Sequence, residues 1–256
     1  MFDFPGAPPG WLETLAPGAV AVAFADPAAT DQPALLGLLS AEEQARHARY
    51  RFERDRQLYR VAHALVRVML GRHLTVDPAR LSLVEGPRRR PRLDDPRADV
   101  DFNLSHTPGL VAVAIAPRGR VGIDVERIVP SRVTPELQRT VFAPEEQQAL
   151  RSMSREREVD AFFTLWTLKE AYLKVRGLGM GVLALDAFAF DVASSRLVRG
   201  PPDDDTTTWR FDTSRPTSEH ALTVACRCDD RSLARAPIPT YAATRTDPRP
   251  LDRTAP

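Results

Sequence analysis

The chain has 256 residues, of which 43% are hydrophobic and 27% are charged, so it can bury the core of one large domain or of two small ones. Its 35 Lys and Arg residues nearly balance 34 Asp and Glu residues, which leaves a net charge of +1. This balance excludes a global field that would recruit nucleic acid or a membrane surface, so any basic site must be local.

The first half of the chain predicts one strand, two helices and then a group of strands. Alternating AVAVAF predicts a strand at 19–24. Ser40, followed three residues later by Glu43, predicts a capping box that opens a helix ending near Tyr50. The run ERDRQLYRVAHALVRVMLG predicts a second helix that stops at Gly71. Further strands are expected at 81–84, 100–104, 110–116 and 120–126.

The second half of the chain resembles the first half in the order of its elements. A short helix should open at Pro144, and a long helix over about 155–176 should end at Gly177. Strands are expected near 187–191, 208–211 and 221–227. A strand, a long Gly-terminated helix and several strands therefore occur twice. This order predicts an α+β fold of two similar halves around a pseudo-twofold axis, spanning 1–118 and 119–230.

The ends of the chain and its cysteines indicate a cytoplasmic protein. The start, MFDFPGAPPG, lacks the basic residues and apolar run of a signal peptide, and nowhere do about 18 apolar residues follow one another. Cys226 and Cys228 alternate along a predicted strand without a second pair to complete a zinc site, so we expect reduced thiols. The Pro/Arg/Thr-rich end, 231–256, lacks periodicity and is expected to be a poorly ordered tail.

The stretch FFTLWTLKEAYLKVRGLGMG, residues 162–181, places charged side chains in a helix suited to burial. Its apolar residues recur at spacings of three and four and predict one core-facing stripe, made of Leu165, Leu168, Tyr172 and Val175. Glu170 and Lys174 then project from the opposite side of the helix. A Glu four residues before a Lys is also typical of an exposed ion pair worth roughly 0.3–0.5 kcal/mol. The helix alone leaves both interpretations open.

Two carboxylates share one face of the predicted strand RVGIDVERI. Alternation puts Val121, Ile123 and Val125 on one side and Gly122, Asp124 and Glu126 on the other. Like charges this close repel unless a cation lies between them, and magnesium favours a few carboxylates with waters and phosphate oxygens. Gly122 would let a bulky ligand approach the backbone. The alternative is a charged edge strand that resists aggregation.

The segment FNLSHTPG places His106 on a predicted turn, with Ser105 and Thr107 as hydroxyl donors suited to a phosphate. A lone turn histidine usually has no special role. Two arginine-rich segments, ARHARYRFERDR and GPRRRPRL, supply planar donors that suit phosphate groups. The first contains Glu and Asp and is also typical of a solvated helix face, whereas the second is either an anion-binding patch or a flexible basic loop.

In this order, these motifs resemble the 4′-phosphopantetheinyl transferases. The resemblance is carried by Asp124 and Glu126 in VGIDVE, by WTLKEAYLK with Lys169, Glu170 and Lys174, by Gly177 and Gly179, and by FNLSHT upstream. Order and spacing are similar to the longer, surfactin-synthetase-activating (Sfp-like) class, and FAPEE resembles the family's FSxxE. The match spans roughly residues 40–227, and its motifs are specific as a set although each one alone is weak.

The resemblance implies a single chain of two similar α+β halves, with coenzyme A bound in the cleft between them. It implies a magnesium-dependent enzyme, described as the holo-[acyl-carrier-protein] synthase type, that moves the 4′-phosphopantetheine arm of coenzyme A onto a serine of an apo acyl or peptidyl carrier protein. The reaction releases 3′,5′-adenosine bisphosphate. The holo-carriers would serve polyketide, nonribosomal peptide or fatty acid synthesis. We expect a monomer that has coenzyme A and carrier proteins as partners.

The same resemblance assigns roles to individual residues. Magnesium would be held by Asp124, Glu126 and Glu170. Glu170 would also accept the proton of the carrier serine, and Lys174 would assist the departing phosphate. His106 would contact the 3′-phosphate, and Arg90, before Pro91, would line the adenine nucleotide site. The other expected coenzyme A contacts are Ser105, Thr107 and Lys169, together with Arg46, Arg49 and Arg56, which stay alternatives because the family's basic residues on the first-half helix do not align cleanly.

Two other functions fit the same residues. A catalytically inert coenzyme A-binding regulatory module would have no need of all four of Asp124, Glu126, Glu170 and Lys174. A magnesium-dependent pyrophosphate hydrolase would use the same carboxylates on water. The sequence does not identify the carrier proteins or their pathway.

Overall fold

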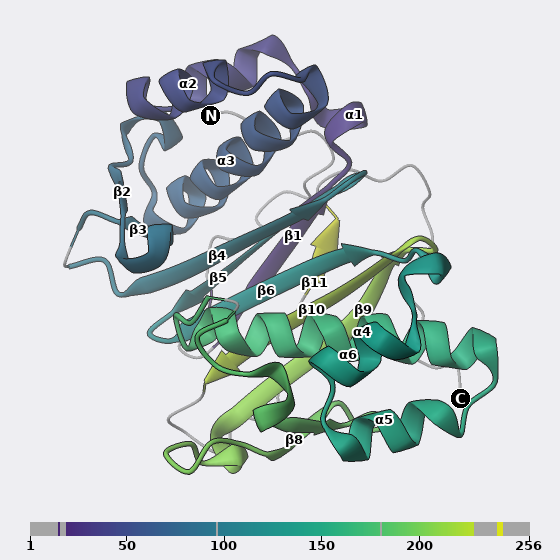
Figure 1. Cartoon of the computed structure of the whole chain (residues 1–256). Coiled ribbons are helices and arrows are strands. Elements are labelled where there is room, and N and C mark those ends of the chain that lie inside the picture. The colour runs from purple at the N-terminus through teal and green to yellow at the C-terminus, as the bar shows by residue number, and fades with distance from the viewer. Residues whose placement is uncertain (1–14, 16–18, 96, 180, 228–239, 243–256) are drawn as a thin grey trace.

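The computed structural model describes residues 15, 19–95, 97–179, 181–227 and 240–242 (Figure 1). Its helices are α1 (Pro27–Thr30), α2 (Ala41–Ala48), α3 (Glu53–Leu74), α4 (Pro135–Val141), α5 (Pro144–Arg151) and α6 (Arg155–Val175). Its strands are β1 (Ala21–Ala25), β2 (Leu83–Glu85), β3 (Pro91–Leu93), β4 (Val100–Thr107), β5 (Leu110–Pro117), β6 (Arg120–Arg127), β7 (Ala189–Asp191), β8 (Arg196–Arg199), β9 (Trp209–Thr217), β10 (His220–Arg227) and β11 (Thr240–Ala242). No helix in these ranges is both long and apolar enough to cross a membrane.

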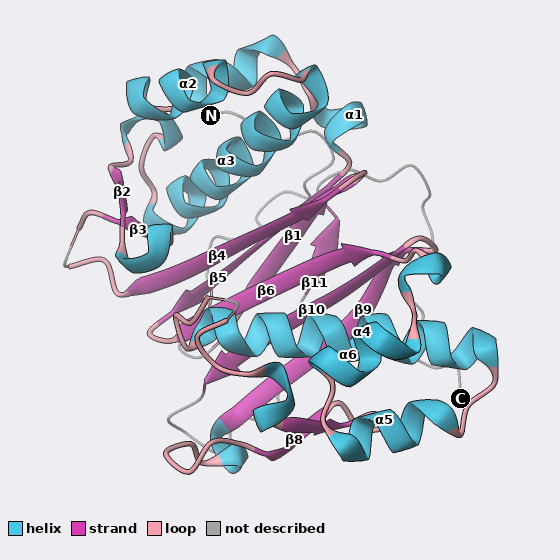
Figure 2. Ribbon diagram, in the orientation of Figure 1, coloured by secondary structure: helices cyan, strands magenta, loops and turns pink. Residues whose placement is uncertain are grey.

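The two halves have the same strand order. In the first half, β1, β5 and β4 are neighbours in that order, and α3 precedes β4 in the chain. In the second half, β6, β10 and β9 are neighbours in that order, and α6 precedes β9. Each long helix covers one face of its own sheet, as Figure 2 shows. The prediction of two similar α+β halves is confirmed.

Three hydrophobic cores hold the helices and the two sheets together. Alternate residues of β1 and β5, such as Ala23 and Val113, pack under α3, whereas Tyr172 and other residues of α6 pack with the second-half strands. The opposite faces of the two sheets meet in a third core that includes Val22 and Ile123. The order of layers is therefore helix, sheet, sheet, helix, and burial of both sheet faces explains the nearly continuous apolar sequences of β1 and β5.

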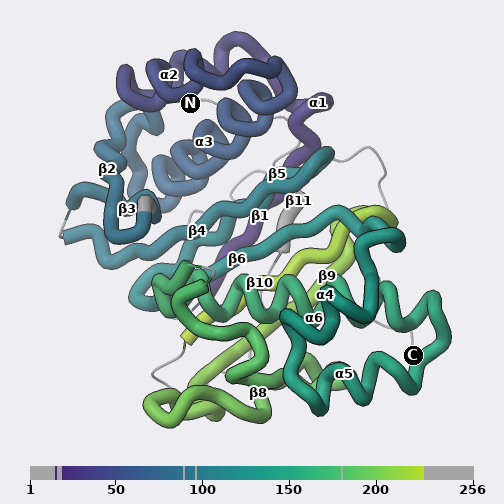
Figure 3. The backbone as a smooth tube through the Cα atoms, viewed as in Figure 1, coloured from purple at the N-terminus to yellow at the C-terminus, as the bar shows by residue number. Residues whose placement is uncertain are grey.

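Strands β4 and β6 lie side by side where the two halves meet (Figure 3), although they belong to different sheets. Alternate side chains of β4 accept hydrogen bonds from main-chain N–H groups of β6. The pairs are Asp101 with Val121 at 2.9 Å, Asn103 with Ile123 at 2.9 Å and Thr107 with Arg127 at 3.2 Å. We call this contact the β4–β6 seam. It fixes the register between the halves without a main-chain ladder.

Several element boundaries differ from the sequence predictions. Helix α3 continues past Gly71 to Leu74, and the residue after it, Thr75, has a φ of 56°. A Cβ on Gly71 would lie 2.9 Å from Pro78, so this glycine serves close packing and not the helix end. His106 lies within β4, where it pairs with Val111, and not on the turn. Within the predicted tail, residues 240–242 form a strand parallel to β1, while the rest of 231–256 lies outside the described residues.

Candidate active site

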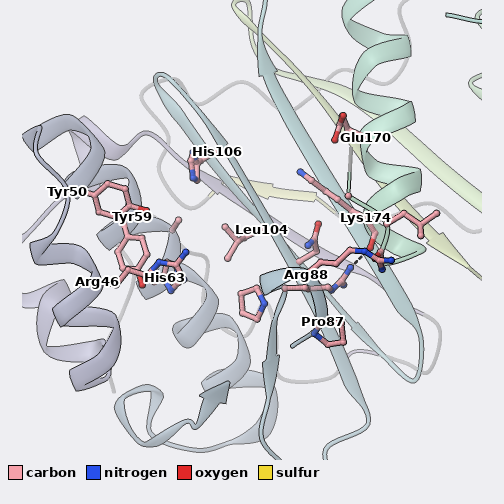
Figure 4. A pocket seen from close by; sticks show the side chains of 17 residues that line it. Arg46, Tyr50, Tyr59, His63, Pro87, Arg88, Leu104, His106, Glu170 and Lys174 are labelled. Atoms are coloured by element: carbon pink, nitrogen blue, oxygen red, sulfur yellow. Dashed lines mark hydrogen bonds between the residues drawn. The ribbon is translucent and has the colours of Figure 1, made fainter. Parts of the chain in front are cut away.

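A pocket of about 360 Å³ opens between the halves (Figure 4). We call it the inter-half pocket. One side is formed by Glu170 and Lys174 of α6, with Gly177 and Gly179 beyond the helix. The other side is formed by first-half residues that include Arg46, Tyr50, Tyr59, His63, Arg88, Arg90, Asn103 and His106. Residues far apart in the sequence therefore meet in one concave site, as expected of a ligand-binding site.

Helix α6 separates a buried stripe from a pocket-facing side. Leu165, Leu168, Tyr172 and Val175 are all buried, as the spacing predicted. Glu170 and Lys174 project from the other side and line the inter-half pocket (Figure 4). The exposed ion-pair interpretation is wrong, because Lys174 bonds across to another element and not to Glu170.

Asp124 of β6 is the partner of Lys174, although Asp124 itself does not line the inter-half pocket. The Lys174 Nζ donates to Asp124 Oδ1 at 2.8 Å, to the main-chain oxygen of Ile123 at 2.8 Å and to Ser105 Oγ at 3.0 Å. Ser105 Oγ in turn donates to Asp124 Oδ1 at 3.0 Å. Asp124 is only 5% exposed, and its second oxygen, Oδ2, is buried without a hydrogen-bond partner. A buried carboxylate oxygen without a partner is unfavourable unless a cation or a donor completes it.

Glu170 and Glu126 share this electrostatic environment. The pKa of Glu170 is raised to about 7, first by burial and then by the charges of Asp124 and Glu126, against the opposing effect of Lys174. The Oε1 atom of Glu170 is also buried without a partner. Burial and the charge of Asp124 raise the pKa of Glu126, whose carboxylate lies 3.4 Å from Arg132. The three carboxylates therefore act on one another across the gap between β6 and α6.

These residues fit a hard divalent cation. Within the described part of the chain, no three His, Cys, Asp or Glu side chains stand in an arrangement that could hold a metal ion by themselves. However, two buried carboxylate oxygens, one from Asp124 and one from Glu170, lack partners, and the third carboxylate raises the local negative charge. Magnesium typically takes one or two carboxylates and completes its shell with waters and phosphate oxygens. An incomplete set of protein ligands beside an open pocket suits that preference.

His106 lines the inter-half pocket from β4 (Figure 4). Its side chain reaches the surface, yet the protein atoms around the ring limit its hydration and lower its pKa, and the nearby charges of Lys174 and His63 lower it further. The positive charge near the ring therefore favours the binding of an anion.

The three alternative arginines occupy different places. Arg46 lines the inter-half pocket, and Arg49 lines a second hollow beside it. Arg56 lines neither, because its guanidinium donates to Glu53 at 2.6 Å and to the main-chain oxygen of Tyr50 at 2.9 Å. Geometry thus favours Arg46 among the three.

Arg88 and Arg90 connect the first half to the end of α6. Arg90 donates to the main-chain oxygen of Lys174, to the main-chain oxygen of Val121 at 2.7 Å and to the Asp101 carboxylate at 2.8 Å. Arg88 donates to the main-chain oxygen of Gly177 at 2.6 Å. Both side chains line the pocket, and each donates to a main-chain oxygen at or just beyond the C-terminal end of α6. The GPRRRPRL segment is therefore a strap across the halves as well as a pocket wall.

Three of the expected coenzyme A contacts lie elsewhere. Lys169 is 1% exposed and forms a 2.9 Å ion pair with Glu146, and its Nζ also donates to the main-chain oxygens of Leu185 and Phe188. Thr107 belongs to the β4–β6 seam. Ser105 forms hydrogen bonds with Asp124 and Lys174 and does not line the inter-half pocket. Side-chain placement gives Lys169 and Thr107 structural roles.

Gly122 does not face a ligand. A Cβ at this position would lie 2.9 Å from the main-chain nitrogen of Val175 and closer still to the carbonyl oxygen of Ala171. The strand and α6 therefore touch through their backbones, and the prediction of a ligand at Gly122 is wrong. This close approach brings Glu170 and Lys174 near Asp124.

Sequence reasoning missed Tyr50, Tyr59 and His63. All three line the inter-half pocket, and the rings of Tyr59 and His63 are stacked with centroids 3.9 Å apart. Tyr59 and His63 are four residues apart on α3, a spacing that places them on one helix face. That spacing is visible in the sequence, but nothing in the sequence indicates that this face meets the second half.

Two family models match successive parts of the chain. The model described as 4′-phosphopantetheinyl transferase, N-terminal, matches residues 26–118, and the model described as 4′-phosphopantetheinyl transferase superfamily matches residues 120–225. The Synechocystis protein slr0495, provisionally named a 4′-phosphopantetheinyl transferase, is 33% identical over 71% of this chain and 75% of its own length. The 4′-phosphopantetheinyl transferase HetI of Nostoc is 35% identical over 58% of this chain and 64% of HetI.

Among solved structures, the holo-[acyl-carrier-protein] synthase (AcpS) of Thermotoga maritima is similar to 43% of this chain. The similarity covers 64% of that synthase, with 21% sequence identity and a TM-score of 0.34.

Proposed function

The chain belongs to the 4′-phosphopantetheinyl transferase superfamily, and on that basis we propose how its own residues activate a carrier protein. The chain is a transferase of the two-half, Sfp-like type, because an N-terminal family model precedes the superfamily model. This replaces the holo-[acyl-carrier-protein] synthase type that we expected. In the proposed reaction, the 4′-phosphopantetheine arm of coenzyme A passes to a serine of an apo acyl or peptidyl carrier protein, and 3′,5′-adenosine bisphosphate leaves.

The observation that supports this proposal is the close contact between α6 and β6 next to the inter-half pocket. Glu170 lines the pocket between the halves, and burial together with the charge of Asp124 raises the pKa of its carboxyl group to about 7. A base with a pKa near neutrality can accept the proton of an attacking serine. Lys174 can then supply positive charge to the departing phosphate from a position 2.8 Å from Asp124.

Asp124, Glu126 and Glu170 are the residues that would hold magnesium. When bound, the ion would neutralise charge on the pyrophosphate oxygens during transfer. The protein's own residues keep the carboxylates in place: Ser105 and Lys174 orient Asp124, and Arg132 lies beside Glu126. The buried Oδ2 of Asp124 and Oε1 of Glu170, both without partners, support this assignment.

We also propose that the two functional halves are residues 1–118 and 119–230. The similar strand orders and the two family matches, at 26–118 and 120–225, support a division at this point. Coenzyme A and carrier proteins are the proposed partners. We propose that the modified carriers serve polyketide, nonribosomal peptide or fatty acid synthesis. We also propose that the enzyme acts as a monomer in the cytoplasm.

The experiment is incubation of the chain with magnesium and coenzyme A, with and without an apo-carrier protein, followed by intact mass measurement. We expect a mass increase on the carrier and carrier-dependent release of 3′,5′-adenosine bisphosphate. Carrier-independent release would indicate a pyrophosphate hydrolase. Binding of coenzyme A without release, across a panel of apo-carriers, would indicate an inert regulatory module.

A further inference from the structure

Arg132 forms an ion pair with Glu126, one of the three proposed magnesium ligands. Its Nη1 lies 3.4 Å from Glu126 Oε2, and the two side chains are 47% and 23% exposed. Within the described part of the chain, the Glu126 carboxylate has no other ion-pair partner. The guanidinium carbon of Arg132 also lies 5.8 Å from the centroid of the Trp166 ring, a distance at which a cation is attracted to an aromatic face. Glu126 is therefore paired with a cation that itself rests on a ring.

The main chain on either side of Arg132 is fixed, whereas its side chain is not. Arg132 ends a short turn, Pro130–Arg132, that follows β6. Arg155 of α6 donates through one guanidinium nitrogen to the main-chain oxygens of Pro130 and Val133, both at 3.0 Å. The Arg132 side chain is half exposed, and its contact with Glu126 is long for a hydrogen bond. The guanidinium can therefore turn away from Glu126 without a change in the backbone.

Trp166 connects this ion pair to the second element of the proposed metal site. It lies four residues before Glu170 on α6, so both side chains project from the same face of the helix. Its ring is only partly buried and packs on Phe162, with centroids 6.1 Å apart and an interplanar angle of 19°. Arg132 thus rests on α6, one turn away from Glu170, while it pairs with Glu126 of β6.

The proposed ligands do not yet converge on one point. Within the residues that the structure describes, no three His, Cys, Asp or Glu side chains form a group that could hold a metal ion. Asp124 Oδ2 and Glu170 Oε1 have no hydrogen-bond partner to give up. Glu126 differs from both, because a cation already lies beside one of its oxygens. A divalent ion at this site must displace Arg132 or bind next to its charge, and either course weakens binding.

We propose that Arg132 is a positioning residue that competes with magnesium for Glu126 and so sets the magnesium concentration at which the site fills. This inference rests on the proposed function, in which Glu126 is a metal ligand. In the metal-free chain, Arg132 holds the Glu126 carboxylate on the side of Trp166. Glu126 exchanges this partner for the ion, and the guanidinium then changes its position over the Trp166 ring.

The test is Arg132→Met, which keeps an unbranched side chain next to Trp166 and removes the charge. The Kd for Mn²⁺ is measured on the full chain by electron paramagnetic resonance, without coenzyme A or a carrier. We expect this Kd to fall about threefold to tenfold, because the ion no longer displaces an ion pair and no longer meets the charge of Arg132. Arg132→Lys keeps the charge, so its Kd should stay within about twofold of the wild type.

Arg139→Met is the matched control. Arg139 is also an exposed arginine of the second half, and it pairs with Glu136 on α4 at 3.0 Å. Its replacement changes the net charge of the chain by the same amount, but the Kd for Mn²⁺ should stay within about twofold of the wild type because a distant exposed charge is screened. An equal fall of the Kd in both variants would show a general effect of charge and would overturn the role of Arg132.

Tryptophan fluorescence gives a second measurement that does not depend on activity. Saturation with Mg²⁺, an ion that does not quench tryptophan, should change the emission of the wild type because Arg132 moves over the Trp166 ring. The change should be absent in Trp166→Phe and strongly reduced in Arg132→Met. An emission change that persisted in Trp166→Phe would contradict this movement.

An unchanged Kd for Mn²⁺ in Arg132→Met, with cooperative urea unfolding preserved, would overturn the proposal. A raised Kd would also overturn it, because Arg132 would then orient Glu126 for the ion. If Arg132→Met did not unfold cooperatively, Arg132→Gln would decide by the same criterion. A wild-type chain that bound no Mn²⁺ would overturn the metal site and this inference together. A wild-type chain that bound Mn²⁺ but modified no carrier would contradict the transferase reaction alone, and the Kd values would still decide the role of Arg132.

Discussion

A side-chain carbon on Gly122 would overlap the carbonyl oxygen of Ala171, so β6 and α6 are in direct backbone contact where the two carboxylate-bearing elements face each other. We predict that Gly122→Ala forces α6 away from β6 and lowers the free energy of unfolding by about 1–3 kcal/mol, because backbone atoms cannot move aside as a flexible side chain can. Glu170 and Lys174 would move with the helix, so the transfer rate should fall as well. Urea unfolding and single-turnover transfer measure the two effects.

Gly119→Ala is the matched control, because the nearest atoms to its added methyl group would lie at 3.9 Å. This variant should keep wild-type stability and activity. If Gly122→Ala behaved like Gly119→Ala in both measurements, close approach of β6 and α6 would not be what positions Glu170 and Lys174.

Asp124→Ala and Glu126→Ala should each abolish transfer. Either substitution leaves the proposed magnesium site short of one anionic ligand. Asp124→Ala also removes the 2.8 Å partner of the Lys174 ammonium group. The measurements are kcat/KM at saturating magnesium and the affinity of the free protein for Mn²⁺, followed by electron paramagnetic resonance. Retention of more than about a tenth of wild-type kcat/KM, a loss of less than about 1.4 kcal/mol, would contradict the ligand role of that residue.

Features that depend on local periodicity could be predicted from the sequence. The capping box of Ser40 and Glu43 is present, with both reciprocal hydrogen bonds, and the buried stripe of α6 has the predicted members. The alternation of β6 also holds, since Val121 and Ile123 enter the core between the sheets while Asp124 faces α6. Each of these follows from the angle between successive side chains along one element.

Features that depend on contacts between distant elements could not be predicted in this way. Lys169 and Lys174 occupy the same helix, and only the packing of α5 shows that Lys169 is the partner of Glu146. The orientation of the His63 ring depends on Glu43, which lies on a different helix. Gly122 gives no local sign that Ala171, about fifty residues later, will lie against it. Motif resemblance identified the region of the site, whereas side-chain partners decided which residues enter it.

Thr107→Val tests whether Thr107 serves the β4–β6 seam or the ligand. The substitution keeps the shape of the side chain but removes the Oγ1 that accepts from the Arg127 N–H at 3.2 Å. We expect the free energy of unfolding to fall by about 1–3 kcal/mol, because that N–H loses its partner, and the KM for coenzyme A to stay unchanged. Thr140→Val, at an exposed position of α4, should change stability by less than about 0.5 kcal/mol. A raised KM for coenzyme A with unchanged stability would show that Thr107 contacts the ligand.

Lys169→Met should destabilise the second half and not weaken coenzyme A binding. The substitution leaves Glu146 buried without its cationic partner, and breaking such a pair typically costs about 3–5 kcal/mol. The double variant Glu146→Gln with Lys169→Met should cost less than the sum of the single variants, as a double-mutant cycle would measure. Calorimetry on the folded Lys169→Met protein should give a wild-type Kd for coenzyme A. A weakened Kd with wild-type stability would mean that Lys169 reaches the ligand after all.

Glu170→Gln should separate stability from activity. Burial, and then the charge of Asp124, raises the pKa of this carboxyl from an ordinary value of 4.5 to about 7 in the folded protein. A carboxyl that holds its proton more tightly when folded stabilises the fold fully below its unfolded pKa and loses that contribution as pH rises through its folded pKa. Without metal, the neutral Gln should therefore make the protein more stable than the wild type above pH 7, by about 1–3 kcal/mol, and the difference should shrink toward pH 5. Urea unfolding in EDTA across this range measures it.

Transfer should change in the opposite direction, because Gln cannot accept the serine proton. Removal of a general base typically slows a reaction by about 10² to 10⁴, so the defect should exceed that of Lys174→Met, which removes only support for the departing phosphate. In single-turnover transfer, raising magnesium should recover the part of the loss that comes from weaker metal binding and none of the part that comes from proton transfer. Full recovery would show that Glu170 is a ligand alone and that another group takes the proton. A wild-type rate at every magnesium concentration would remove Glu170 from the reaction, even though it lines the pocket beside Lys174.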